Sequence, residues 1–247
     1  DPMCGGTPWL SPYAYCAGNP VMYIDPSGAE VRGASRADAK KIAEDLKDIF
    51  RDETFNEFRT LITNNGSKIA RISEADISAA FEGVELTEDQ QALVDIVVNT
   101  INSKDKHVVE YLKSDGNMSS KAADAFSSEF EKLGISMTAT AAHYGGIPSF
   151  IIAPLGTEGL TTQTSHGSYS VLYDNKELYQ WGRSVTTGHE LFGHGRSLAI
   201  GRNATQNIDA IQTENLILRV MGINFIRDGI DHGLNINSPT TLIPSFR

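Results

Sequence analysis

The chain has 247 residues, of which 40% are hydrophobic and 21% charged, and its formal net charge is −10. This composition is typical of a soluble globular protein with one large domain or two small ones. No apolar run reaches the roughly 20 residues of a membrane-spanning helix, so we expect no membrane partner. The acidic charge also argues against nucleic acid as a partner, because binding it relies on Lys and Arg that neutralise phosphates.

Residues 1–29 differ from the rest of the chain. They are rich in Pro, Gly, Tyr and Ser, contain no Lys or Arg, and hold both cysteines, Cys4 and Cys16. This composition predicts a turn-rich segment. We therefore expect a boundary between residues 1–29 and a domain over 30–247. That domain has no disulfide framework, which fits a protein that works in a reducing cytosol or unfolds during delivery.

The first part of the domain is predicted to be mostly helical. Ser35 is the expected N-cap of its first helix, and Thr87 with Gln90 form the capping pattern of a later one. The spacing of apolar residues predicts one or two helices over 35–62, a helix over 86–104, a strand over 106–113 and a helix over 119–134.

Strand signals cluster in the second part. Short β-branched or aromatic runs predict strands over 136–144, 147–155 and 167–174, and helical spacing predicts helices over 184–201 and 207–225. Helices, a small mixed sheet and two further helices indicate an α+β fold.

The stretch "TTGHELFGHG" at residues 186–195 places His189 next to Glu190 and five positions before His194. Two histidines four positions apart on a helix bind one Zn²⁺, and an adjacent glutamate acts as general base. Five positions separate the rings by about 140° on a regular helix, too far for one ion. A π-bulge absorbs an extra residue, and Gly193 would tolerate it. A straight helix here would refute a zinc site.

The six residues from His189 to His194 resemble the H-E-L-L-G-H zinc motif of the dipeptidyl peptidase III family, which has the same spacing. In gluzincin peptidases a following helix supplies a third, carboxylate ligand, and the string from Glu214 to Arg219 resembles the corresponding region of secreted bacterial effector zinc peptidases. This resemblance implies Glu214 as the third ligand. Asp209 is the alternative ligand or a residue that orients a histidine.

These resemblances imply a zincin-like fold, with N-terminal helices, a small mixed sheet, an active-site helix and a following carboxylate-bearing helix. Glu190 would be the general base of a zinc metallopeptidase. His232 is a candidate for stabilising the oxyanion. We expect the strand over 167–174 to be the sheet edge along which an extended peptide substrate pairs.

The first residues carry a second resemblance. Asp1-Pro2, "SPYAYCAGNP" and "YIDPSG" follow in order the pattern that ends the core domain of RHS-repeat proteins, D-P … S-P-Y-x-Y … N-P … D-P-x-G. In several members two aspartates of this junction act as an aspartyl self-protease, which cleaves the chain just past D-P-x-G. The matching residues here are Asp1 and Asp25. One departure is Ala29, where self-cleaving relatives usually have Leu or Met.

The RHS resemblance implies a toxin or effector domain over 30–247, enclosed by an RHS shell, delivered by a bacterial secretion system and active in the cytoplasm of a target cell. Its partners would be a protein substrate, the shell and a cognate immunity protein. Two alternatives stay open. The domain is a toxin of another class, such as a nuclease or deaminase, or a non-catalytic binding or plug domain. The acidic charge disfavours a nuclease. The absence of a Cys-x-x-Cys pair after Cys16 disfavours a deaminase, whose zinc site would use one.

Overall fold

The computed structural model of the chain describes residues 30–113, 116–149, 158–174, 181–225, 227 and 242–246. The junction segment 1–29, with Asp1 and Asp25, and the candidate residue His232 lie outside the described residues. The boundary at residue 30, the cleavage pair and the oxyanion role therefore stay predictions.

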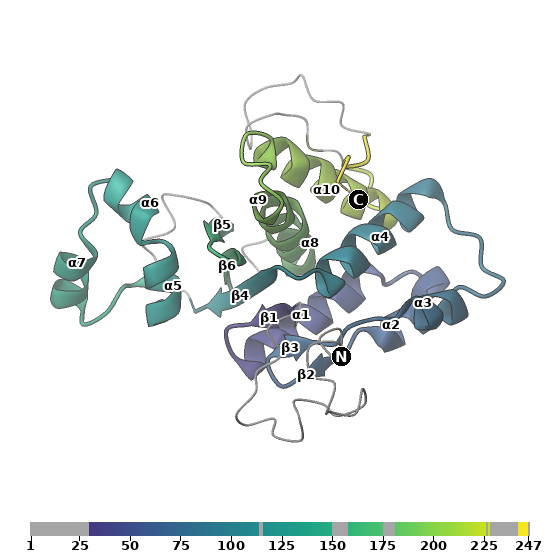
Figure 1. The fold of residues 1–247 in the computed structure, drawn as a ribbon, viewed down its shortest axis with the longest axis horizontal. Coiled ribbons are helices and arrows are strands. Elements are labelled where there is room, and N and C mark those ends of the chain that lie inside the picture. The colour runs from purple at the N-terminus through teal and green to yellow at the C-terminus, as the bar shows by residue number, and fades with distance from the viewer. Residues whose placement is uncertain are drawn as a thin grey trace, which may run out of the picture.

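Single strands and pairs of strands are separated by groups of helices along the described part (Figure 1). The helices are α1 (Arg36–Ile49), η3 (Glu53–Phe55), α2 (Asn56–Leu61), α3 (Glu74–Ala80), α4 (Glu88–Asn102), α5 (Ser120–Ala125), α6 (Ser127–Lys132), α7 (Met137–Tyr144), α8 (Arg183–Gly188), η6 (His189–Gly195), α9 (Arg196–Ala199) and α10 (Gln206–Val220). The strands are β1 (Glu30–Gly33), β2 (Asn64–Asn65), β3 (Lys68–Ile69), β4 (Lys106–Leu112), β5 (Gly159–Thr164) and β6 (Gly167–Tyr173).

The strands form one mixed sheet in the order β2-β3-β1-β4-β6-β5. The central strands β1, β4 and β6 run parallel, with Val31 opposite His107 and Val109 opposite Ser170. The outer strands β3 and β5 pair antiparallel with β1 and β6. This arrangement confirms the predicted α+β class with a small mixed sheet.

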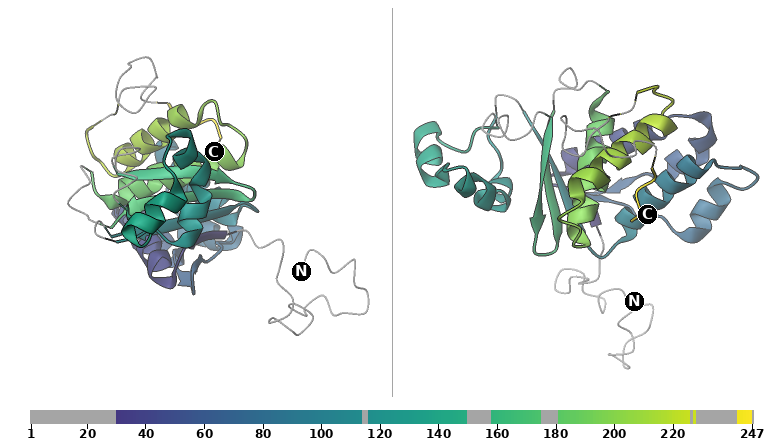
Figure 2. Two further views of the ribbon diagram at one scale, coloured as in Figure 1. Left: turned by 90° about the vertical axis from the view of Figure 1, so that its left-hand side faces the viewer. Right: turned by 90° about the horizontal axis from the view of Figure 1, so that it is seen from above.

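The sheet separates two apolar cores. Side chains alternate between the faces of a strand, and on β4 the side chains of Val109 and Tyr111 enter the larger core while Leu112 enters the smaller one. The larger core is formed with α1, α4, α8, η6 and α10, and the smaller one with α5 and α6. Figure 2 shows the short helices α5–α7 on one side of the strands and the long helices on the other.

The predicted helix starts are confirmed by their caps. The Ser35 side chain accepts a hydrogen bond from the Asp38 backbone, and the Asp38 side chain accepts one from the Ser35 backbone, which makes a complete capping box. Thr87 and Gln90 form the same reciprocal pair at the start of α4. Local hydrogen bonds of this kind are readable from sequence because they join residues three positions apart.

The predicted strand over 136–144 is wrong, because these residues form helix α7. Ser136 caps it by accepting a hydrogen bond from the Ala139 backbone, and Gly145 ends it with a left-handed conformation at φ 69°. Helix α7 has no buried residue, so the alternating Thr side chains have no sheet to face and alanine's helix propensity prevails. The predicted helix over 119–134 is interrupted at Phe126, where α5 ends and α6 begins.

The expectation that residues 167–174 form the sheet edge is also wrong. These residues contain β6, which pairs with β4 on one side and β5 on the other and is buried throughout. The edge strand next to it is β5, whose threonine-rich sequence has little apolar content. None of the helices described has both the length and the apolar character needed to cross a lipid bilayer.

Candidate metal centre

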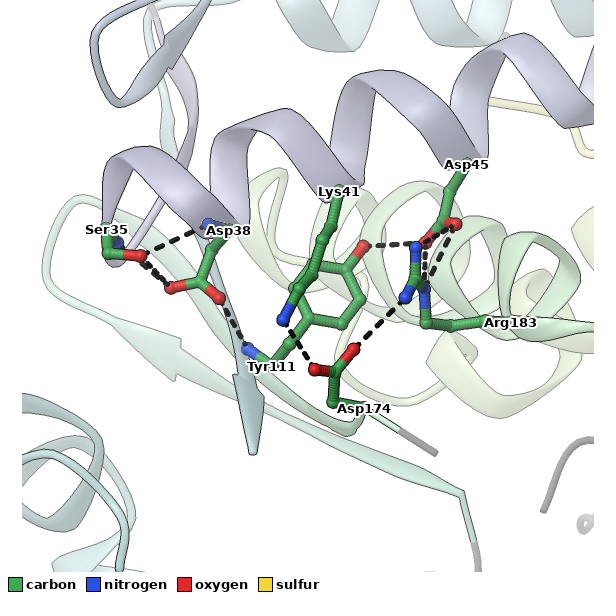
Figure 3. A network of polar contacts seen from close by, with 7 residues as sticks. All are labelled: Ser35, Asp38, Lys41, Asp45, Tyr111, Asp174 and Arg183. Atoms are coloured by element: carbon green, nitrogen blue, oxygen red, sulfur yellow. Dashed lines mark hydrogen bonds and ion pairs between the residues drawn. The ribbon is translucent and has the colours of Figure 1, made fainter. Parts of the chain in front are cut away.

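The helix that carries the "HELFGH" motif is fixed at its start to α1. Arg183, the first residue of α8, donates from Nε and Nη2 to the Asp45 carboxylate of α1, at 2.9 and 2.8 Å. Thr187 Oγ1 and Tyr111 OH donate to the same carboxylate at 2.7 and 2.8 Å. Figure 3 shows the Asp45–Arg183 pair beside the Tyr111 ring. These buried bonds hold the first turns of the helix before His189 is reached.

The motif itself forms a π-helix, η6, from His189 to Gly195. Hydrogen bonds in a π-helix run between residues five positions apart, so each turn contains about one more residue than in an α-helix. Side chains five positions apart return to the same face, and the ring centres of His189 and His194 lie 4.9 Å from each other. The sequence prediction of a bulge in this motif is confirmed.

Packing against α10 requires glycine at position 193. A Cβ atom at this position would lie 2.5 Å from the Cα atom of Ala210 on α10. Helix α10 therefore approaches η6 closely at the point where the bulge occurs. This contact places the following carboxylate-bearing helix against the motif, as the sequence predicted.

His189, Glu190 and His194 form a group that could hold a metal ion. One ligand atom from each of the three side chains lies within 4.8 Å of the others, and all three residues are buried. Two imidazole nitrogens and a carboxylate oxygen are donors that suit Zn²⁺. The group could therefore hold a metal ion, and its donor types suit the predicted Zn²⁺.

His194 is oriented by a residue that sequence reasoning missed. Its Nδ1 atom lies 3.1 Å from the amide oxygen Oε1 of Gln206, the first residue of α10. An amide oxygen only accepts, so Nδ1 carries the proton and the lone pair is on Nε2, the form in which imidazole binds a metal. Nothing local links Gln206 to His194, because the contact depends on how α10 packs.

Glu214, the predicted third ligand, contacts His189. Its Oε2 atom lies 2.7 Å from His189 Nδ1 and 3.0 Å from Arg227 Nη1. Burial alone would raise the pKa of Glu214, but His189 and Arg227 outweigh it and lower that pKa to about 2. Burial alone would lower the pKa of His189, but Glu214 and then Glu190 raise it. Glu214 is not in the group of three described above, so its role as ligand stays a prediction.

Glu190 is held from the edge strand. Thr161 Oγ1 of β5 donates a 2.6 Å hydrogen bond to Glu190 Oε2. Burial raises the pKa of Glu190, and the charges of Glu214 and Glu158 raise it further against the opposing effects of His189 and Thr161. A carboxylate whose pKa is raised in this way suits proton transfer near neutral pH.

The carboxylate of Asp209, the alternative ligand, contacts other residues. Its carboxylate accepts hydrogen bonds from Ser197 at 2.7 Å and Thr205 at 3.1 Å, and it pairs with Arg202 at 2.9 Å. These partners give Asp209 a structural place between α9 and α10, where it is 1% exposed. The described contacts of this carboxylate include neither histidine of the motif.

The centre thus combines two imidazoles, a carboxylate of raised pKa and a second, charged carboxylate, from η6 and α10, beside an edge strand. Such a set can bind a divalent cation and can move a proton next to it. Neither a protein-family model nor a curated protein nor a solved structure matches this chain.

Proposed function

We propose that residues 30–247 form a zinc-dependent endopeptidase with a zincin-like arrangement. The observation that carries this proposal is the π-helix η6, which brings His189 and His194 to one face despite their spacing. A regular helix would have kept the two rings apart. The unusual backbone occurs at the one place where metal binding needs it, and π-helical turns occur often at functional sites.

In this proposal His189, His194 and Glu214 hold Zn²⁺, which would polarise the scissile carbonyl and activate a water molecule. Glu190 takes a proton from the attacking water on its carboxylate and then gives that proton to the leaving amine. Gln206 keeps His194 in the tautomer that binds metal. The burial of the two histidines, Glu190 and Glu214 supports the proposal, because a low dielectric strengthens the interactions of charged groups.

We assign the substrate to the outer edge of β5. Within the described residues this strand pairs only with β6, so its other side offers backbone groups to an extended peptide. Strand β5 also lies directly beside Glu190, through Thr161. A peptide added to this edge would pass next to the proposed general base.

The RHS resemblance of residues 1–29 supplies the biological setting of this proposal. The domain would be the toxin of a bacterial RHS protein, delivered to a target cell and neutralised by an immunity protein. Expression of residues 30–247 in a bacterial cytoplasm should then be toxic, and Glu190→Gln should remove the toxicity. Toxicity that survives this variant would contradict the assignment.

Metal content and hydrolysis test the proposed chemistry. The purified chain should bind one Zn²⁺, and His189→Ala or His194→Ala should remove it. Glu190→Gln should keep the metal but lower the rate of hydrolysis of an unbiased peptide mixture about 10²- to 10⁴-fold, the range for a lost general base.

The matched controls lie on other surfaces of the molecule. His143→Ala changes an exposed histidine of α7, and Glu129→Gln changes a carboxylate that accepts from Thr162 on the opposite side of β5. Both variants should keep metal and activity. A wild-type chain without bound zinc, or full hydrolysis by Glu190→Gln, would overturn the proposal.

A further inference from the structure

The carboxylate of Glu190 fits a cradle on the edge strand β5. Thr161 Oγ1 donates to Oε2 at 2.6 Å. Gly159 is two positions earlier on the same face of the strand. A Cβ atom at Gly159 would lie 2.9 Å from Glu190 Oε1 and 2.8 Å from its Cγ atom. Thr161 binds the Glu190 carboxylate, and the absence of a side chain at Gly159 leaves room for it.

A second hydroxyl, that of Ser170, extends this hydrogen bond into a chain. Ser170 of β6 lies opposite Thr161 in the sheet register, and their hydroxyl oxygens are 2.8 Å apart. An ionised Glu190 only accepts, so the single hydroxyl proton of Thr161 is directed to it and Ser170 donates to Thr161. Ser170 is completely buried. The chain Ser170–Thr161–Glu190 therefore runs from the interior of the sheet to the metal centre.

We propose that Thr161 is a positioning residue for the general base. By holding Oε2, Thr161 keeps the Glu190 side chain in one rotamer and leaves Oε1 to exchange the proton during peptide hydrolysis. This inference rests on the proposed function, because it assigns Glu190 the role of base. It adds that the base is aligned by the sheet and not by its own helix.

Kinetics of matched variants test this role. Thr161→Val keeps the size of the side chain and removes the donor, so kcat should fall about 10- to 100-fold, the range for a lost hydrogen bond to a charged group. The KM and the zinc content should not change, and Thr161→Ser should restore most of kcat. Gly159→Ala should also lower kcat, because the new methyl group displaces the carboxylate.

The control is Thr162→Val. Thr162 is the next residue of β5, and it too donates to a carboxylate, Glu129 Oε1 at 2.9 Å, but on the opposite side of the sheet. This variant removes the same kind of hydrogen bond from the same strand and should leave kcat unchanged. A fall in kcat as large as that of Thr161→Val would mean that any weakening of β5 has this effect, and would overturn the inference.

A measurement without metal or substrate tests the contact directly. In the metal-free chain, Thr161→Val and Glu190→Gln should change the free energy of unfolding non-additively in a double-mutant cycle. Additive effects, or an unchanged kcat for Thr161→Val in a chain whose wild type hydrolyses peptides, would refute the positioning role and leave the proposed function intact. A wild type without zinc and without activity would instead overturn the proposed function, and this inference with it.

Discussion

Replacing Asp45 by alanine should be among the most damaging single changes in this chain. The Asp45 carboxylate accepts from Arg183, Tyr111 and Thr187 at distances from 2.7 to 3.1 Å. Its loss leaves the Arg183 guanidinium, which is 5% exposed, with Asp174 as its remaining carboxylate partner. Breaking a buried ion pair by removing one partner costs about 3–5 kcal/mol, because the other charge stays buried.

A loss of this size is a large fraction of the stability of a folded domain, which is about 5–15 kcal/mol. For a chain of this length it corresponds to a fall in Tm of about 6 to 20 °C. Urea unfolding followed by circular dichroism measures the change. The control is Asp48→Ala, which removes one 2.6 Å hydrogen bond from Ser184 between the same two helices and should cost about 1 kcal/mol.

Replacement of both partners separates the pair from its surroundings. Asp45→Leu combined with Arg183→Met removes the buried charges together, so the double variant should be more stable than Asp45→Ala. The reasoning would be refuted if Asp45→Ala lost less than about 1 kcal/mol, because the contacts in Figure 3 would then contribute little.

Four further outcomes can be measured on the same protein. Gly193→Ala should cost about 1–3 kcal/mol by overpacking against the α10 backbone and should lower zinc content; unchanged unfolding would contradict the close packing. The folded pKa of Glu214, about 2, lies below 4.5, so its stabilisation of the metal-free chain should persist above pH 4.5 and disappear toward pH 2; Glu214→Gln should flatten this acid limb. The pKa of His189 is raised above 6.5, so its protonated form stabilises the metal-free fold below pH 6.5, and this stabilisation is lost as pH rises through the raised pKa. Zn²⁺ binds only the deprotonated imidazole, so zinc affinity in a chelator competition should increase with pH. Gln206→Ala should weaken zinc binding about 10- to 100-fold by releasing His194, and equal affinity would exclude that role.

Features that depend on nearby residues were predictable from the sequence. The two capping boxes involve residues three positions apart, and the bulge follows from the distance between His189 and His194 along one helix. The resemblance to gluzincin peptidases implied Glu214 on the helix that follows the motif, and the structure places its carboxylate 2.7 Å from His189 Nδ1. In each case the information lies within one or two adjacent elements.

Features that depend on distant pairing were not predictable. Thr161 meets Glu190 only because β5 joins the edge of β6, and the polar sequence of β5 carries little strand signal. The central strand β1 was missed for a similar reason: it has four residues, two of them charged, and its Glu30 is buried with Arg32 and Lys68 as ion-pair partners. The expectation of an edge at 167–174 was wrong because pairing partners cannot be read from one strand.

The parallel pairing of β1, β4 and β6 has a consequence for when the centre can form. Parallel neighbouring strands are joined by long crossover connections. The middle of the sheet therefore forms only when β1 pairs with β4, and β4 with β6, across these long segments of chain. Closing such long loops lowers the conformational entropy of the chain before stabilising contacts have formed, and this makes folding slow. The motif helix follows β6 in the chain and packs on α1 and α10. The contact of Glu190 with Thr161 of β5 therefore forms only after these long-range pairings, and a chain kept in extended form would hold the residues of the centre apart until it folded.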